Sequence, residues 1–329
     1  MAYILLIIGF VLLVKGADTF VDGSVGIAEK FKIPSLIIGL TIVAMGTSAP
    51  EAAVSITAAL AGQNDIATGN VIGSNIFNTI VVLGMCSAIK PIHVEGSMMK
   101  KEFPVNLAVT FLMLGLAITN LASTGGYVFS RVDGLVLLVA FIGYLLMTIL
   151  PELKSEKEHP HEEEAHKPIS MGLAVFKIAI GLVGIILGGR VVVDAASDIA
   201  INFGVSENLV GLTIVAIGTS LPELVTSIVA ASKGESDMAV GNVIGSNIFN
   251  ILFVLGISSA IHPINVNPIS IYDLWILIAV TVLTTIFCKT GLKINRVEGV
   301  ILVLIYVAYT AFLIIRSTSP MLGVTMVVS

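Results

Sequence analysis

The sequence predicts an all-α membrane protein with ten transmembrane helices, arranged as two inverted-topology repeats of five. Three observations lead to this prediction: the composition, ten long apolar stretches, and motifs of the first half that return in the second. Of 329 residues, 56% are hydrophobic and 12% are charged, and the mean hydropathy is +1.02. A soluble domain carries about 25% charged residues. The composition therefore excludes a soluble enzyme, a disordered protein and a nucleic-acid-binding protein, which would need a basic patch.

Ten apolar stretches have roughly the length that a helix needs to cross a bilayer. They are long and continuous, whereas the strands of a membrane β-barrel are short and alternate in polarity. The first stretch is interpreted as a helix and not as a signal peptide, because charge begins only at Lys15, after the apolar run. Cys86 and Cys288 are expected to act as small apolar side chains without a disulfide or metal role. The predicted helices span residues 2–28, 34–60, 66–89, 104–121, 132–150, 170–201, 206–231, 237–261, 270–288 and 297–315.

Basic residues predict the orientation, because cytoplasmic loops carry an excess of lysine and arginine. The loops on the opposite side carry only Arg131 and Arg316. We therefore expect the odd-numbered loops to be cytoplasmic and both termini to be extracytoplasmic. Short loops suit the inner membrane of a prokaryote. The basic residues of the odd-numbered loops are Lys30, Lys32, Lys90, Lys100, Lys101, Lys154, Lys157, Lys167, Lys233, Lys289, Lys293 and Arg296.

The two halves of the chain share polar motifs in register. Residues 39–51 read GLTIVAMGTSAPE and residues 211–223 read GLTIVAIGTSLPE, with eleven of thirteen positions identical. Residues 69–78 and 241–250 both read GNVIGSNIFN. The offset is 172 in both blocks, and it also carries Asp22 onto Asp194. Apolar composition alone does not reproduce Gly, Thr, Ser, Pro, Glu and Asn in register, so the match indicates an internal duplication.

The duplication predicts a first five-helix repeat (1–150), an acidic cytoplasmic linker (151–169) and a second five-helix repeat (170–329). Since five is odd, the second repeat enters the membrane from the opposite side. Such inverted repeats build secondary transporters, whose binding site lies at the repeat interface near the midplane of the membrane. The glutamates and histidines of the linker raise the alternative of a metal site. Their spacing does not match a ligand set, so a solvated tether is the preferred interpretation.

Glu51 and Glu223 are the candidate ion-binding residues, because a carboxylate deep in a membrane is costly and usually functional. No lysine or arginine lies at comparable depth in the helices of the two motifs. Pro50 and Pro222 lack an N–H group and clash with the carbonyl four residues back, so each frees carbonyl oxygens nearby. Freed carbonyls at membrane depth are tolerated only where they are buried in protein or line a cavity. Such oxygens are suitable ligands for Na⁺ and Ca²⁺.

Further oxygen-bearing side chains recur every four residues and therefore share a helix face with one another. For Asn70, Asn75, Asn242 and Asn247, hydrogen bonding between helices is as plausible as ion binding. The sets with this spacing are Thr47, Glu51 and Ser55; Thr219, Glu223 and Ser227; Asn70, Ser74 and Asn78; and Asn242, Ser246 and Asn250.

The duplicated motifs resemble the paired α-repeats of the calcium/cation antiporter superfamily, and most closely its sodium/calcium exchanger branch with its prokaryotic members. The resemblance spans the whole ten-helix arrangement. It implies an antiporter that exchanges Na⁺ for Ca²⁺ by alternating access, with no enzymatic activity and no cofactor. Its partners would be the two ions and the lipid bilayer, with no nucleic acid and no obligate protein partner. Two carboxylates can neutralise one Ca²⁺ or two Na⁺, which makes competition for them a basis for exchange.

By motif position, the resemblance also implies a role for each candidate residue. Glu51 and Glu223 would be shared carboxylate ligands, and Thr47 and Thr219 would offer main-chain carbonyl oxygens to Ca²⁺. Asn78 and Asn250 would complete the middle site. The two outer Na⁺ sites would be lined by Ala44, Ser48 and Ser74, and by Ala216, Ser220 and Ser246.

One departure from the family pattern leaves alternatives open. Several members, notably the K⁺-dependent exchangers, have aspartate where this chain has Asn250. That puts K⁺ coupling in doubt and leaves the Na⁺ stoichiometry open. Members of the Ca²⁺/H⁺ branch carry a motif similar to G-N-A-x-E in the corresponding helices, whereas this chain has Gly73 and Gly245 in that stretch. Ca²⁺/H⁺ exchange therefore remains the alternative function within the superfamily.

Two other classes of protein fit the sequence less well. An intramembrane enzyme that used Ser48 or Ser220 as a nucleophile would need a base within reach, and His93 and His262 lie at helix ends. A cation channel would bind similar ions without coupling their fluxes. Outside the motifs, Lys15 with Asp18, and Arg190 with Asp194, have the spacing of ion pairs within a helix.

Overall fold

The computed structural model describes residues 1–119, 121, 125–158, 170–204, 214 and 216–318, without the side chains of 152–158, 216, 317 and 318. Within these residues, eight helices are long and apolar enough to cross a membrane, and one bent pair of helices brings the number to nine. The chain is thus an all-helical protein with several membrane spans. The first half of the predicted helix 206–231 falls largely outside the described residues.

The first half of the chain follows the predicted order of helices, two of which are interrupted by π-helical turns. Such turns occur frequently at functional sites. The helices and turns are α1 (Ala2–Phe31), α2 (Ser35–Ile38), η1 (Gly39–Val43), α3 (Ala44–Thr47), α4 (Ala49–Leu60), α5 (Asn64–Phe77), η2 (Asn78–Val82), α6 (Leu83–Ile89), α7 (Gly96–Lys100), α8 (Glu102–Thr119) and α10 (Arg131–Glu158).

The second half contains corresponding elements in the same order. They are α11 (Met171–Asn202), α13 (Ala216–Gly218), α14 (Leu221–Lys233), α15 (Ser236–Phe249), η4 (Asn250–Leu255), α16 (Gly256–Ile261), α17 (Pro268–Lys289) and α18 (Arg296–Thr318). Both GNVIGSNIFN motifs end at the first residue of a π-helical turn, at Asn78 and at Asn250.

Helix α10 continues eight residues into the segment predicted as linker. It passes through Pro151 and ends at Glu158. Residues 152–158 read ELKSEKE, which are mostly strong helix formers. Their propensity outweighs the break that Pro151 would otherwise favour. The rest of the predicted linker lies outside the described residues.

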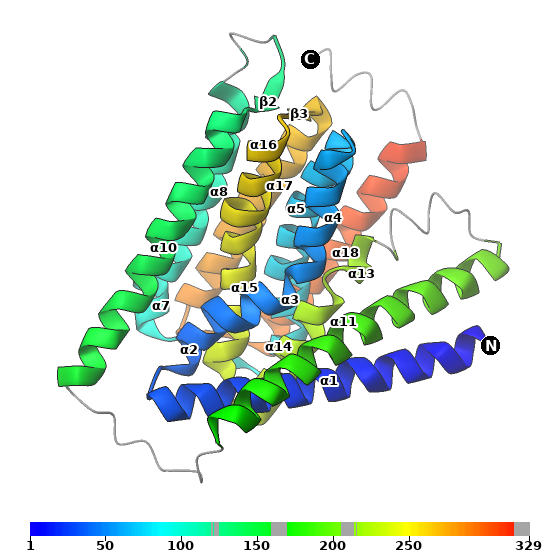
Figure 1. The fold of residues 1–329 in the computed structure, drawn as a ribbon. Helices are drawn as coiled ribbons and strands as arrows, with labels where there is room; N and C mark the ends of the chain where they lie inside the picture. Colours follow the sequence, from blue (N-terminus) through cyan, green and yellow to red (C-terminus); the bar gives the residue numbers. More distant parts are fainter. Residues whose placement is uncertain (120, 122–124, 159–169, 205–213, 215, 319–329) are drawn as a thin grey trace.

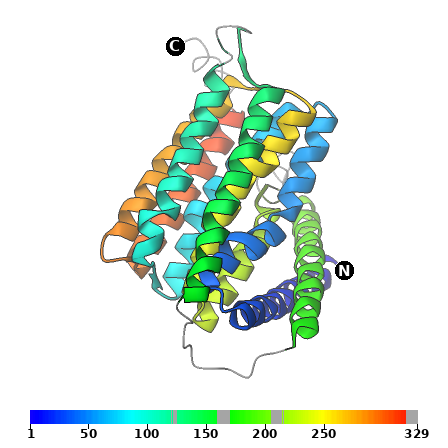
Figure 2. The same ribbon diagram turned by 60° about the vertical axis from the view of Figure 1, so that its left-hand side comes forward.

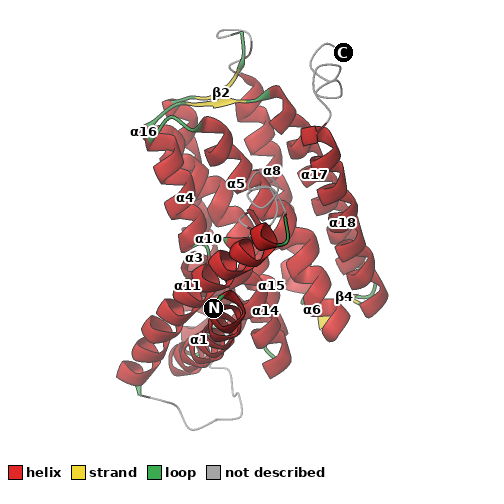
Figure 3. Cartoon of the chain, turned by 90° about the vertical axis from the view of Figure 1, so that its right-hand side faces the viewer, coloured by secondary structure: helices red, strands yellow, loops and turns green. Residues whose placement is uncertain are grey.

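In the described residues, four short strands lie between the helices, although the sequence predicts none. Strand β1 (Ile92–His93) pairs with β4 (Lys293–Ile294), and β2 (Tyr127–Phe129) pairs with β3 (Ile264–Val266), both antiparallel. Figure 3 shows β2 and β4 at opposite ends of the molecule. Each pair joins one strand from each half of the chain, so the two halves exchange equivalent contacts at the two ends.

Glycines at the helix contacts repeat this exchange. A Cβ atom added to Gly84 of α6 would lie 2.8 Å from the carbonyl oxygen of Gly299 in α18. A Cβ atom added to Gly134 of α10 would lie 2.6 Å from the carbonyl oxygen of Gly256 in α16. Gly256 is the counterpart of Gly84 at the offset of 172. Glycine at these positions lets two backbones approach closely, as is usual where membrane helices pack.

Helices α1 and α11 lie side by side and cross the end of the bundle at an angle to the other helices (Figures 1 and 2). Glycines of both helices form the contact. A Cβ atom on Gly188 would lie 2.5 Å from the backbone nitrogen of Leu13, and one on Gly16 would lie 2.7 Å from that of Ile185. The outward faces of both helices expose large apolar side chains such as Ile7 and Phe176, as expected for helices that face lipid.

The inner helices bury polar side chains as well as apolar ones. Helices α4, α5, α14 and α15 carry buried threonine, serine, asparagine and glutamate. In Figure 1 these helices occupy the interior of the bundle, with α8 and α10 on one flank and α1 and α11 on another. Cys86 and Cys288 are buried free thiols, as expected.

Candidate cation-binding site

The helix that carries Glu51 is broken one residue after Thr47. Helix α3 ends at Thr47, α4 begins at Ala49, and the axis bends by 49° between them. Ser48, at the break, has φ −83° and ψ 8°. The cause is Pro50, which has no N–H group and clashes with a carbonyl in the preceding turn. The sequence predicts one continuous helix over 34–60 with freed carbonyls near Pro50, and the structure divides that helix at Ser48.

The second half has the same local geometry. Ser220 lies between α13 and α14 with φ −93° and ψ 6°, and Pro222 stands in the first turn of α14. Glu51 and Glu223 consequently occupy equivalent positions, each in the first turn of the helix that follows the break. Both side chains are fully buried.

Each glutamate receives a hydrogen bond from a serine of the other half. Ser48 Oγ donates to Glu223 Oε1 at 2.7 Å, and Ser220 Oγ donates to Glu51 Oε1 at 3.0 Å. Among the described residues, neither glutamate forms an ion pair with lysine or arginine. The reciprocal bonds bring the two motifs together, and the carboxylates lack a basic partner.

The remaining carboxylate oxygens have no protein partner in the part of the chain that the structure describes. There, Glu51 Oε2 and Glu223 Oε2 are buried without a hydrogen bond, and so are both polar atoms of Asn78 and Oδ1 of Asn250. A buried polar atom without a partner costs free energy, and a buried charge costs more. Both carboxylates thus keep one oxygen that is available to a ligand. A hard cation is the kind of ligand that such oxygens favour.

Asn70 and Asn242 hold the two helices of each half together. Asn70 Nδ2 donates to the main-chain oxygen of Glu51 at 3.0 Å and to Ser55 Oγ at 2.8 Å. Asn242 Nδ2 donates to the main-chain oxygen of Glu223 at 3.4 Å and to Ser227 Oγ at 2.9 Å. Their amide oxygens accept across the repeats, from Thr219 Oγ1 and Thr47 Oγ1. The two residues therefore have the interhelical hydrogen bonds that the sequence leaves as one of two interpretations.

Asn75, Asn247 and Asn250 form a second set of cross-repeat bonds. Asn75 donates to the main-chain oxygen of Asn247 at 3.1 Å, and Asn247 donates to Thr79 Oγ1 at 2.9 Å. Asn250 Nδ2 lies 3.2 Å from Asn75 Oδ1 and 3.3 Å from Ser74 Oγ. These bonds use the amide nitrogen of Asn250 and leave its oxygen free to face a cation.

Comparison with known proteins agrees with this geometry. The family model described as sodium/calcium exchanger protein matches residues 1–150 and 173–315. The chain belongs to the sodium/calcium exchanger family. It is 40% identical over 317 residues to the putative antiporter CaxA of Alkalimonas amylolytica, with 94% of this chain and 97% of the relative covered. It is 32% identical over 342 residues to the sodium/calcium exchanger MaX1 of Methanosarcina acetivorans, with coverage of 94% and 98%.

A solved structure of the same family has the same fold. The sodium–calcium exchanger NCX_Mj, in a form soaked with zero Na⁺ and Ca²⁺, superposes with a TM-score of 0.80 at 33% sequence identity. The match covers 95% of this chain and 98% of that structure. At this identity and coverage, the likeness extends to the whole helical core of the exchanger.

The other predicted site residues of this family member lie as follows. Ser74 and Ser246 are buried, and Ser246 Oγ lies 3.5 Å from the main-chain oxygen of Ala44. Thr47 is fully buried, whereas Thr219 is partly buried. The side chain of Ala216 lies outside the described residues.

Thr79 and Thr226 are polar residues near the motifs that the sequence analysis missed. Thr79 accepts the bond from Asn247, and Thr226 Oγ1 is buried without a hydrogen bond. The duplication could not find them, because Ile251 and Val54 occupy the corresponding positions of the other half. In the sequence each is a single threonine next to a motif residue, and such a threonine is only a weak signal of function.

One predicted ion pair within a helix is wrong and the other is confirmed. Arg190 and Asp194 of α11 lie 3.9 Å apart. Asp18 instead pairs with Lys233 of α14 at 2.7 Å. The tertiary contact between α1 and α14 supplies a closer partner than Lys15, three residues away on the same helix.

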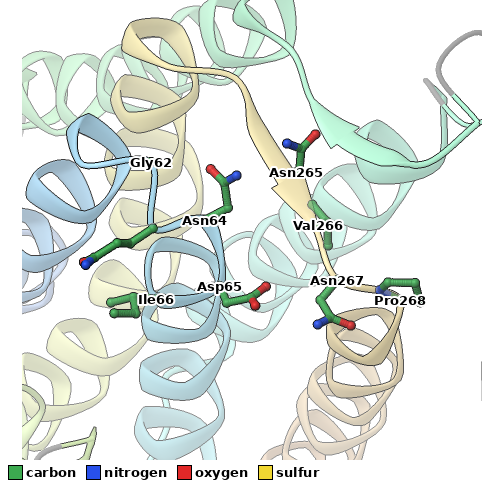
Figure 4. Close-up of a pocket in the computed structure, with 9 residues that line it drawn as sticks. Gly62, Asn64, Asp65, Ile66, Asn265, Val266, Asn267 and Pro268 are labelled. Carbon is green, nitrogen blue, oxygen red and sulfur yellow. The ribbon is translucent and has the colours of Figure 1, made fainter. Parts of the chain in front are cut away.

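A surface pocket of about 480 Å³ lies apart from the buried carboxylates, at the turn between α4 and α5 (Figure 4). It is lined by Gly62, Gln63, Asn64, Asp65, Ile66, Asn265, Val266, Asn267 and Pro268. None of these is among the predicted site residues. The candidate ion-binding atoms lie instead inside the helix bundle.

Proposed function

We propose that this chain is a secondary antiporter that exchanges Na⁺ for Ca²⁺ across a membrane by alternating access. The observation that carries the proposal is the pair of buried glutamates, each hydrogen-bonded to the other half and each left with one unpartnered oxygen. Membership of the sodium/calcium exchanger family supports the choice of ions. NCX_Mj and MaX1 are named as exchangers of the same two ions.

Glu51 and Glu223 are the proposed shared carboxylate ligands. Ca²⁺ takes about six to eight oxygen ligands, which two carboxylates cannot supply alone. The main-chain oxygens of Thr47 and Thr219 and the amide oxygens of Asn78 and Asn250 complete the proposed middle site. The proposed outer Na⁺ sites use Ala44, Ser48 and Ser74 in one half and Ala216, Ser220 and Ser246 in the other.

Exchange follows from competition for the carboxylate pair. One Ca²⁺ or two Na⁺ neutralise the two charges, so a bound ion of one kind excludes the other. Ser48 and Ser220 assist by holding one oxygen of each carboxylate in place. The other oxygen stays available to the ion. Asn250 supplies an oxygen without a charge, which favours Na⁺ coupling over a K⁺-dependent mechanism.

The proposed topology is ten helices in two inverted repeats, 1–150 and 170–329, joined by the cytoplasmic linker 151–169. The exchanged strand pairs at opposite ends support it, as do the exchanged glycine contacts between α6 and α18 and between α10 and α16. A two-fold axis in the membrane plane relates such repeats. The distribution of lysine and arginine places both termini on the extracytoplasmic side of a prokaryotic inner membrane.

Purified protein in liposomes tests the function. We expect ⁴⁵Ca²⁺ uptake when Na⁺ is high inside and low outside, and no uptake when choline replaces Na⁺. Glu51→Gln and Glu223→Gln should each abolish uptake, while the surface variant Glu95→Gln should keep it. Separate pH and K⁺ gradients distinguish the alternative couplings. Ca²⁺ uptake that follows a pH gradient and ignores Na⁺ would replace the proposal with Ca²⁺/H⁺ exchange.

A further inference from the structure

Four charged residues join the α1/α11 pair to the helix that carries Glu223. Lys233, in the last turn of α14, has its Nζ atom 2.7 Å from Asp18 Oδ1 and in contact with Asp22 Oδ1. It also donates to the main-chain oxygen of Asp18 at 3.0 Å. Lys177 of α11 pairs with Asp22 Oδ2 at 3.2 Å. We call Asp18, Asp22, Lys177 and Lys233 the α1–α14 cluster.

The cluster is partly shielded from solvent. The side chains of both lysines are 29% exposed, and those of the two aspartates are 43–44% exposed. Lys233 contacts three oxygen atoms of α1, so its charge is compensated by both aspartates together. The cluster therefore fixes α14 to α1 at one point, and through Lys177 it includes α11.

Helices α1 and α11 behave as one unit in this arrangement, because their backbones meet along a glycine contact. A Cβ atom on Gly181 would lie 2.6 Å from the nitrogen of Phe20, and one on Gly23 would lie 2.8 Å from the carbonyl oxygen of Ala174. Side chains of the pair also pack against the inner helices, because Phe20 lies next to Gly46 of α3 and Val193 lies next to Gly218 of α13. The α1–α14 cluster adds to this packing a polar tie between the pair and α14.

The repeat offset shows that the cluster has no counterpart at the other end. The offset of 172 carries Asp18 to Arg190, Asp22 to Asp194, Lys233 to Ala61 and Lys177 to Leu5. Of these four positions, only that of Asp22 has the same residue type at its counterpart, Asp194. Arg190 pairs with Asp194 inside α11, with both side chains more than two-thirds exposed. Ala61, at the end of α4, has no charge to offer.

This asymmetry matters because inverted repeats exchange their conformations when access alternates. A contact between α1 and α14 in one state corresponds to a contact between α11 and α4 in the other. Where only one of the two contacts can form, its free energy shifts the equilibrium toward the state that has it. Here the sequence permits the contact only at the Lys233 end.

We propose that the α1–α14 cluster is a one-sided latch, which holds the α1/α11 pair against α14 and favours the state closed at the Lys233 end. That end is the one whose loops are rich in lysine and arginine. The inference rests on the proposed alternating access. It adds that the two access states of this chain are unequal in the absence of ions, and it assigns the inequality to Asp18, Asp22, Lys177 and Lys233.

Distances between spin labels at K30C and S232C test the latch, with C86A and C288A as background. Lys30 and Ser232 are exposed, in the last turn of α1 and near the end of α14. Pulsed electron–electron double resonance measures these distances in the full chain, in ion-free lipid nanodiscs. The parent should show one dominant distance. Lys233→Gln should add a longer distance and change the ratio of the two populations by about 1.5- to fivefold, the range expected for partly exposed ion pairs.

Matched variants keep the test decisive. Lys233→Arg should retain the parent distribution, and so should Arg190→Gln, which removes an ion pair within α11 only. D18N/D22N removes the cluster from the α1 side and should reproduce the effect of Lys233→Gln, including where Lys233→Gln fails to fold.

The opposite end provides a gain-of-contact test. A61K combined with R190D gives α4 and α11 the counterparts of Lys233 and Asp18. Added to Lys233→Gln, this pair should raise the longer-distance population further.

An unchanged distribution in both Lys233→Gln and D18N/D22N would overturn the latch, as would an equal change in Arg190→Gln. These measurements need no transported ion. A latch that shifts as expected in a protein without Na⁺-driven Ca²⁺ uptake would reject the proposed function and keep the latch. Normal Na⁺-driven Ca²⁺ uptake together with unchanged spin-label distances would reject the latch and keep the proposed function.

Discussion

Removing the hydroxyl of Ser48 tests whether the two halves of the chain share their carboxylates. Ser48 donates to Glu223 at 2.7 Å. Glu51, which lies in the same half of the chain as Ser48, accepts instead from Ser220. A hydrogen bond to a charged group contributes about 1.5–3 kcal/mol. In double-mutant cycles we expect Ser48→Ala to couple with Glu223→Met by about that amount. Its coupling with Glu51→Met should be smaller, about 0.5 kcal/mol.

The assay is unfolding of the purified protein in mixed micelles without Na⁺ or Ca²⁺, so that no ion screens the carboxylates. The substitution Glu→Met keeps the length of the side chain and removes both acceptor oxygens. The mirror cycle, Ser220→Ala with Glu51→Met, is the internal control and should couple to a similar extent. Coupling of Ser48 to Glu51 as strong as to Glu223 would refute the reciprocal arrangement.

Three further predictions have definite expected outcomes. Asn78→Ala should weaken ⁴⁵Ca²⁺ binding with little loss of stability, since both polar atoms of Asn78 lack partners among the described residues. Asn250→Ala should weaken binding and also lower the free energy of unfolding by about 1–3 kcal/mol, because it removes hydrogen bonds to Ser74 and Asn75. A larger loss of stability in Asn78→Ala than in Asn250→Ala would contradict these contacts. Asn250→Asp adds a charge to the site and should make Ca²⁺ flux sensitive to a K⁺ gradient, in contrast to the parent. Gly188→Ala should destabilise the α1/α11 contact by about 1–3 kcal/mol because its Cβ would meet the backbone of Leu13 at 2.5 Å. Gly115→Ala, inside α8 with nothing within 4 Å, should not destabilise the protein in the same unfolding assay, because alanine is the better helix former.

The sequence predicted the features that depend on hydrophobicity and on local chemistry. Long apolar stretches gave the helical membrane class and most helix positions to within a few residues. Pro50 and Pro222 predicted freed carbonyl oxygens beside Glu51 and Glu223, because the loss of an N–H group acts locally. The helix breaks at Ser48 and Ser220 were not predicted. The duplication selected the polar residues that the structure buries together.

Features that depend on the contacts between helices were beyond a single sequence. The short strands pair across the two halves, and nothing in the two or three residues of β1 or β4 marks them as strands. Asp18 finds its partner on α14, 215 residues away, although Lys15 lies nearer along its own helix. The serine–glutamate bonds also cross the repeats, so spacing along one helix could place these residues on a face but could not pair them.

The cost of burying two carboxylates explains why exchange would be obligatory. Each carboxylate has one oxygen bonded to a serine and one oxygen buried without a partner among the described residues. Two buried carboxylates without a cation are less favourable than the same pair with one bound. A bound Ca²⁺ or a set of Na⁺ removes that cost, so we expect access to alternate most readily when the site is occupied, with one kind of ion in one direction and the other kind in the return.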